Sequence, residues 1–218
     1  MIHSNERKLC LSGWVKENNN TLYETPLKLQ KFLLFYEVFA KVSGENPDFT
    51  HLIGCKKGPV FTNVWSDYTK ERSNFNSAAQ RAFASNSVAI DTARAEKCAF
   101  MVSTMTEKEL SDLIHQMNLW KCKAERIMNG EYQVHLSERD FTSNDEKLIR
   151  ILDTMYPLQL VENSTVVCLD SKYFVFTKSD AQHLTEEHFD ILRTLAENEE
   201  LHNPVFIDID DRRRLIVV

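Results

Sequence analysis

The chain has 218 residues, of which 43% are hydrophobic and 27% charged, a balance typical of a globular protein. Its net charge of −6 argues against a general nucleic-acid-binding protein, because such proteins usually carry a clustered basic face. No stretch approaches the roughly 18 apolar residues of a membrane span, and the polar first residues predict no secretory signal, so we expect a cytoplasmic protein without a membrane partner. Five dispersed cysteines without a CxxC pair predict neither a disulfide framework nor a zinc ribbon.

The first element that the pattern predicts is a buried helix from Pro26 to about Gly44. Thr25 is a suitable N-cap, proline is tolerated in the first helical turn, and glycine is a common helix stop. The residues between them are too apolar for a surface helix. A short extended segment over residues 51–60 is expected to follow and to end in a Gly-Pro turn.

More helices are predicted as far as residue 156, where a proline follows. We expect them over residues 62–72, 74–84, 89–105, 107–117, 120–128 and 143–155. Two of these have the sequence of a capping box, in which the N-cap hydroxyl and a glutamate three residues later satisfy each other's backbone N–H groups. The two pairs are Thr106 with Glu109, and Ser143 with Glu146.

Beyond Pro157 the hydrophobic period changes from helix to strand. Two β-prone runs flank Asp170–Lys172 and predict a hairpin, a helix is expected over residues 185–199, and a second hairpin with a charged tip closes the chain. We therefore expect an α+β protein. A mainly helical region covers residues 1–156, and a C-terminal β-containing region of two hairpins and a helix, residues 157–218, packs on it.

The motifs of common catalytic and cofactor sites are missing from the sequence. It contains no GxGxxG or GxxxxGK[ST] phosphate loop, no HExxH and no GxSxG. His183 and His188 could bind a metal with Cys168 or Asp180, but two histidines five residues apart would not share a helical face. A Cys–His pair formed only in the fold stays open. We predict no enzyme, no catalytic residue, no cofactor and no metal.

Two groups of segments together resemble a known family. The first is Leu-Lys-Leu-Gln-Lys-Phe-Leu-Leu-Phe-Tyr at 27–36, then Lys-Gly-Pro-Val at 57–60 and Trp65; the second is Leu-Ser-Asp-Leu-Ile-His at 110–115, Trp120, and Leu-Ser-Glu-Arg-Asp-Phe at 136–141. Their order and spacing are similar to those of the Panacea domain, also described as SocA-like or phage GepA-like, over about residues 24–141. The sequence departs from that pattern at Lys57, Ile114 and Leu119.

The resemblance implies an antitoxin-like protein, of a kind that phages and prophages encode, that binds a cognate toxin or acts as an adaptor for its degradation by a protease. The residues that carry it, as structural or partner-binding residues, are Gln30, Lys31, Tyr36, Gly58, Pro59, Trp65, His115 and Trp120. Core and turn requirements also account for them, and the last two are expected to form a buried aromatic and hydrogen-bonded pair. The alternative is a small nucleotide- or nucleic-acid-directed enzyme or ligand-binding phage factor. The oligomeric state stays open.

Overall fold

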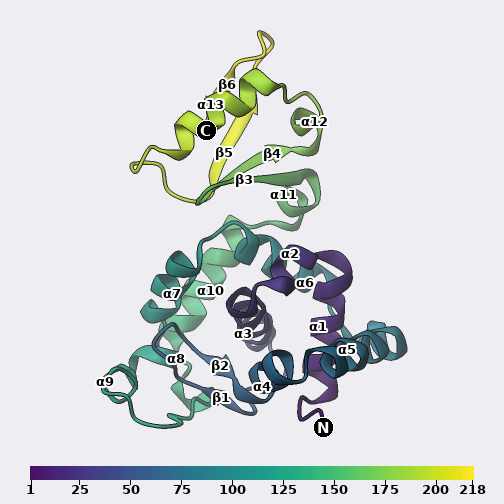
Figure 1. Ribbon diagram of the computed structural model, residues 1–218. Coiled ribbons are helices and arrows are strands. Elements are labelled where there is room, and N and C mark those ends of the chain that lie inside the picture. The colour runs from purple at the N-terminus through teal and green to yellow at the C-terminus, as the bar shows by residue number, and fades with distance from the viewer.

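The helical region is built around α3 (Pro26–Val42), in which every residue from Lys28 to Ala40 is buried. The computed structural model describes residues 1–218, and Figure 1 shows α3 in the middle of a ring formed by the other elements of this region. Pro26 stands in the first turn, where its missing N–H has no helical acceptor. The predicted buried helix is confirmed, although the Thr25 hydroxyl donates to the carbonyl of Thr21 instead of capping α3.

Two helices that the sequence pattern did not predict precede α3. They are α1 (Glu6–Asn18) and α2 (Asn20–Glu24). Polar residues on both sides of α1 hide its periodicity, yet seven of its 13 residues are buried and it packs against α3 and α5. Gly13 explains the close packing, because a Cβ atom there would collide with the carbonyl oxygen of Ala79 and with Phe83.

The rest of the helical region follows the predicted order with corrected ends. Its elements are β1 (Leu52–Ile53), β2 (Val60–Phe61), α4 (Thr62–Lys70), α5 (Arg72–Asn86), the 3₁₀ helix η1 (Ser87–Ala89), α6 (Thr92–Ser103), α7 (Glu107–Gln116), α8 (Asn118–Lys121), α9 (Ala124–Met128), the 3₁₀ helix η2 (Glu138–Asp140) and α10 (Ser143–Met155). The helix predicted from residue 89 begins only after the N-cap Asp91. The piece predicted over residues 120–128 is two short helices, α8 and α9.

One predicted capping box is confirmed and the other is wrong. Thr106 and Glu109 form the reciprocal pair at the start of α7. The box of α10 is formed by Thr142 and Asp145, one residue before the predicted pair. Asp145 is buried and its carboxylate also accepts hydrogen bonds from the backbone N–H groups that begin α8. This tertiary contact determines the N-terminus of α10, which local sequence alone does not reveal.

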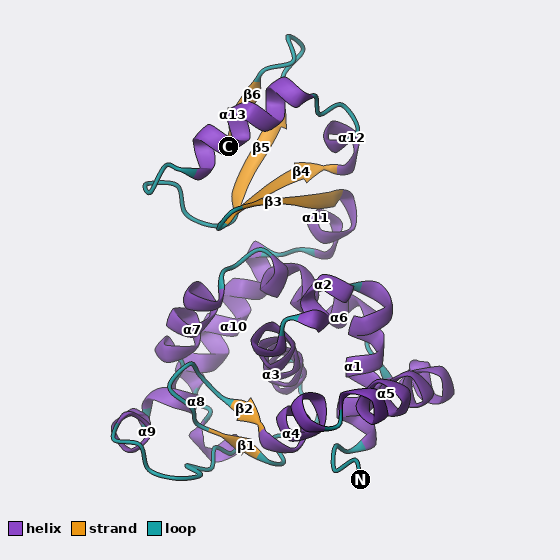
Figure 2. Ribbon diagram, in the orientation of Figure 1, coloured by secondary structure: helices purple, strands orange, loops and turns teal.

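The C-terminal region contains a four-stranded sheet with a helix on one face. Its elements are α11 (Leu158–Asn163), β3 (Ser164–Leu169), β4 (Lys172–Thr177), α12 (Lys178–Ala181), α13 (Glu186–Ala196), β5 (Val205–Ile209) and β6 (Leu215–Val217). The strand order is β3-β4-β5-β6; the first and last pairs are the two predicted antiparallel hairpins, and β4 runs parallel to β5. Figure 2 shows α13 lying across this sheet.

The two regions have separate hydrophobic cores. A cluster of 37 buried residues fills the helical region, and a cluster of 5 lies between the sheet and α13. The protein is 60% helical and 11% strand, so the predicted α+β class is confirmed. None of the helices has the length and apolar character that a membrane crossing needs.

Polar contacts join the two regions. The side chain of Asn203 donates to the Glu109 carboxylate at 3.0 and 3.2 Å, and Lys28 donates to the hydroxyl of Tyr173 at 3.0 Å. Asn203 also accepts from the N–H of Tyr173 at 2.8 Å. The first turns of α7 and α3 therefore position the sheet relative to the helical core.

Candidate functional site

The Gly-Pro turn between β1 and β2 is where most of the motif residues meet. Gly58 and Pro59 are both buried, although Lys56 and Lys57 just before them are exposed. Gly58 has a φ of +93°, a backbone conformation that glycine adopts without strain. Its N–H donates to the carbonyl of Cys55 at 2.8 Å and closes the turn.

Lys31 of α3 lies directly beneath this turn. Its side chain is completely buried, and its ammonium donates to the carbonyl of Pro59 at 3.2 Å. A Cβ atom on Gly58 would lie only 2.7 Å from Lys31 Nζ, so the close approach of lysine and turn also requires glycine. Burial lowers the pKa of Lys31 to about 7, and no carboxylate oxygen lies within 4.0 Å of its nitrogen.

Gln30, the neighbour of Lys31, holds the other end of the same turn. Its side-chain oxygen accepts from the N–H of Phe61 in β2 at 2.8 Å. Because Gln30 is buried, this bond satisfies a polar group that would otherwise be costly inside the core. Two consecutive polar residues of this buried helix therefore find their partners on one backbone segment.

The opposite wall of the turn comes from α7 and α8. Ser111 donates to the carbonyl of Lys57 at 3.2 Å, and the indole N–H of Trp120 donates to the carbonyl of Cys55 at 2.9 Å. The ring of His115 stacks on Trp120 with 3.9 Å between ring centroids. The predicted aromatic pair is confirmed, but the predicted hydrogen bond within it is wrong, because the Trp120 donor is used by the turn. His115 Nε2 is buried and has no hydrogen-bond partner.

Two of the eight motif residues lie apart from the turn. Tyr36, further along α3, accepts a hydrogen bond from the N–H of Asp91 at 2.9 Å, and its ring lies near the guanidinium groups of Arg7 and Arg94. Trp65 lies on α4 with 40% of its surface exposed. The turn thus gathers Gln30, Lys31, Gly58, Pro59, His115 and Trp120.

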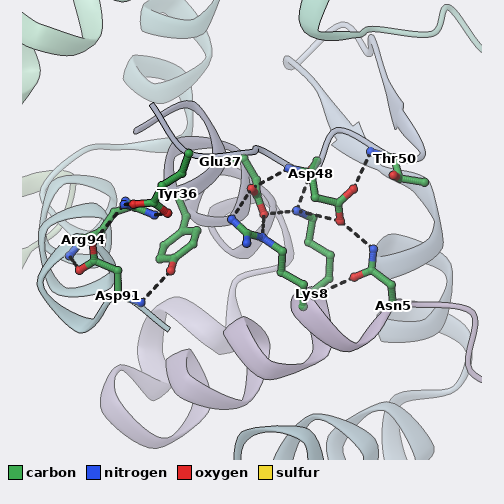
Figure 3. Close-up of polar contacts among 10 residues, drawn as sticks. Asn5, Lys8, Tyr36, Glu37, Asp48, Thr50, Asp91 and Arg94 are labelled. Atoms are coloured by element: carbon green, nitrogen blue, oxygen red, sulfur yellow. Dashed lines mark hydrogen bonds and ion pairs between the residues drawn. The ribbon is translucent and has the colours of Figure 1, made fainter. Parts of the chain in front are cut away.

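A buried ionic cluster that the sequence did not predict lies at the first turn of α1 (Figure 3). Glu37 of α3 is fully buried and accepts two hydrogen bonds from Arg7, both at 2.9 Å, one from Lys8, and one from the N–H of Asp48 at 2.8 Å. Lys8 also donates to the carbonyl of Asp48 at 2.9 Å. Burial lowers the pKa of Lys8, while the nearby Glu37 and Asp48 oppose that shift.

Asp48 completes this cluster from the loop after α3. Burial acts to raise its pKa, but the Lys8 ammonium and hydrogen bonds from Thr50 and Asn5 outweigh burial and lower it to about 2. On the other side of Tyr36, Arg94 pairs with Glu45 and with Asp91. Each charge in the cluster has a partner, so its arrangement is typical of a structural network rather than of a reactive site.

The protein offers no grouping of side chains that would bind a metal ion. No three His, Cys, Asp or Glu residues converge. His188 instead caps α13: one ring nitrogen accepts from the N–H of Thr185, and the other lies 2.7 Å from the carbonyl oxygen of Arg213. All five cysteines are free thiols, and only Cys122 and Cys168 are exposed.

Comparisons with protein-family models, with curated proteins and with solved structures found no match for this chain. The candidate site is therefore defined by its own contacts. These form a rigid surface turn, held from below by Gln30 and Lys31 and from the side by Ser111 and Trp120.

Proposed function

We propose that the protein is an antitoxin-like protein that binds a partner toxin and neutralises it, or acts as an adaptor for its degradation. The observation that carries the proposal is the convergence of the motif residues on one turn. The segments that resemble the Panacea domain lie up to 90 residues apart, between Gln30 and Trp120. Their side chains bind a backbone group of every second residue from Cys55 to Phe61. Because these segments all bind the same turn, we treat them as one structural unit.

The outer side of this unit supports a role in binding. Lys56 and Lys57 project from a turn whose backbone is bound on both sides, and a rigid support reduces the entropy lost when a partner docks. Trp65 lies on α4, which begins directly after the turn, and is a large exposed aromatic of the type that dominates protein interfaces. Lys56 and Lys57 give the turn itself a positive charge, although the whole chain has a net charge of −6, so this surface suits an acidic patch on the partner.

The experiment is co-expression with the product of the neighbouring gene, followed by growth measurement and pull-down. The proposal expects the neighbour to be toxic alone, harmless with this protein, and recovered bound to it. Trp65→Ala should weaken binding by roughly 30-fold, the equivalent of about 2 kcal/mol for an interface hot spot.

Tyr132→Ala is the control, because Tyr132 is also an aromatic residue, has 84% of its surface exposed and lies outside the motif segments. It should bind like the unaltered protein. A neighbour that is neither toxic nor bound would remove the proposal's main support. Equal binding by both variants would place the interface away from α4.

A further inference from the structure

A cleft of about 770 Å³ lies between the helical region and the sheet, away from the Gly-Pro turn. Its helical wall comes from α2, α3, the end of α6 and the start of α7, and its other wall comes from β3, β4 and the turn between them. The side chains that line it are mostly neutral polar groups, with Leu22, Phe100 and Val166 as apolar members. This volume is in the range of small-molecule sites, which is about 300–1,000 Å³.

Lys28 is the only cation that lines this cleft. It is 9% exposed, and its ammonium donates to the Tyr173 hydroxyl at 3.0 Å and makes a long contact of 3.5 Å with the carbonyl of Ser103. Both partners are neutral, and no carboxylate oxygen lies within 4.0 Å of Lys28 Nζ. Burial lowers the pKa of Lys28, an effect opposed by the more distant Cys168, Glu107 and Glu109.

The other two buried lysines of the helical region show why Lys28 is unusual. Lys8 is more deeply buried than Lys28 but is neutralised by Glu37 and Asp48. Lys31 lacks an ionic partner but is sealed beneath Gly58 and lines none of the principal cavities. Lys28 alone combines burial, the absence of an ion pair and a position in the wall of a cavity. A buried cation is costly unless an anion accompanies it.

Tyr173 adds a second donor next to this lysine. Its hydroxyl oxygen accepts from Lys28, and its own O–H faces Cys168, a weak sulfur acceptor that a ligand oxygen can replace. Burial raises the pKa of Tyr173 to about 12, so the hydroxyl keeps its proton at neutral pH. Lysine and tyrosine together form a donor pair suited to a carboxylate.

The remaining charges of the cleft are carboxylates. Glu107 and Asp170 line it, both exposed, one at the start of α7 and one in the β3–β4 turn. A simple anion would be repelled by these two groups, whereas a ligand with an ammonium group would be attracted. The cleft therefore presents a buried positive group, two exposed negative groups and a polar lining with apolar parts.

We propose that this cleft binds a small zwitterion, an amino acid or short peptide, whose carboxylate is held by Lys28 and Tyr173 and whose ammonium group faces Glu107 or Asp170. Leu22, Phe100 and Val166 contact an apolar side chain of the ligand, and the neutral polar residues bind its amide groups. The site is independent of the proposed antitoxin role, because no residue that lines it holds the Gly-Pro turn and it needs no protein partner.

Cysteine footprinting tests this site, because Cys168 lines the cleft and Cys122 is exposed outside it. The purified full chain is alkylated with iodoacetamide with and without the dipeptide alanyl-leucine, and the rate at each cysteine is read by mass spectrometry. We expect saturating dipeptide to slow alkylation of Cys168 at least threefold and to leave Cys122 unchanged. No protection of Cys168 at 10 mM dipeptide, roughly the weak limit for a specific small ligand, would overturn the proposal.

Two matched ligands test the charge assignment. N-acetyl-alanyl-leucine lacks the ammonium group, and alanyl-leucine amide lacks the carboxylate. Each should need at least a tenfold higher concentration than alanyl-leucine for half-maximal protection of Cys168. Equal protection by all three would refute a zwitterion site.

Lys28→Gln should abolish protection, and Lys147→Gln, which changes an exposed lysine outside the cleft, should not. Tyr173→Phe keeps the ring and removes only the hydroxyl, so it tests the same contact if Lys28→Gln proves unstable; it should weaken protection several-fold. Unchanged protection in a folded Lys28→Gln or Tyr173→Phe protein would refute the assigned carboxylate contact.

Discussion

Replacing Glu37 by alanine removes the carboxylate that Arg7 and Lys8 share inside the helical region. Glu37 and Lys8 have side chains that are 0% and 1% exposed, so the variant leaves the Lys8 ammonium buried with only Asp48 as an ionic neighbour. Loss of one member of a buried ion pair typically destabilises a protein by about 3–5 kcal/mol. For a protein of this size that corresponds to a fall in melting temperature of roughly 6–20 °C.

Urea unfolding followed by tryptophan fluorescence measures this loss, because all three tryptophans lie in the helical region. Glu24→Ala is the matched control: Glu24 also pairs with an arginine, at 2.7 Å, but its side chain is 57% exposed. An exposed pair contributes about 0–1 kcal/mol. The double variant Lys8→Met/Glu37→Leu should recover most of the lost stability, because it removes both buried charges. If Glu37→Ala loses no more stability than Glu24→Ala, the cluster is not the buried network described above.

Three further predictions concern the turn and the contact between the two regions. Burial lowers the pKa of Lys31 to about 7 from an ordinary value of 10.5, so between pH 7 and pH 10.5 the unfolded chain binds more protons than the folded protein. The free energy of unfolding, measured in urea, should therefore rise by roughly 2 kcal/mol from pH 7 to pH 9 relative to that of Lys31→Met. Parallel pH profiles of the two proteins would contradict this. Gly58→Ala should lower the free energy of unfolding by roughly 1–3 kcal/mol more than Gly44→Ala does, as measured by thermal unfolding. Both glycines have a positive φ, but only at Gly58 would an added Cβ meet other atoms within 4 Å. Similar losses in the two variants would mean that backbone strain alone explains the effect. Asn203→Ala should accelerate hydrogen exchange in β4 and β5 by about 10-fold, equivalent to roughly 1.4 kcal/mol for hydrogen bonds between half-buried groups, without affecting α3. Unchanged exchange would show that the bonds of Asn203 do not stabilise the sheet.

Strong local patterns predicted the parts of the fold that depend on neighbouring residues. The density of apolar residues between Pro26 and Gly44 is compatible only with a buried helix, and α3 ends at Val42. The β-prone runs around Asp170–Lys172 specified a hairpin, and β3 and β4 pair there in register. The sequence also predicted the Gly-Pro turn and the stacking of His115 on Trp120, but it did not predict that Gln30 and Lys31 meet at that turn.

The parts that were missed depend on contacts between distant residues. Arg7 and Lys8 are ordinary surface residues by sequence, and only the packing of α1 on α3 brings them to Glu37, about 30 positions later. Gly13 weakens the helix propensity of α1 while permitting its closest contact with α5. The cleft around Lys28 combines residues from 18 to 173, so no local pattern indicates it.

The separation of the two cores has a consequence for the order in which the chain acquires structure during synthesis. The 37-residue core of the helical region is complete once Tyr156 has been made, whereas the smaller core needs strands up to Ile207. A ribosome adds residues 157–207, which the second core needs, in roughly 3–10 s. During that interval the newly made helical region exposes Lys28 and Glu109 to water, and the sheet then folds onto a surface that already carries its hydrogen-bond partners.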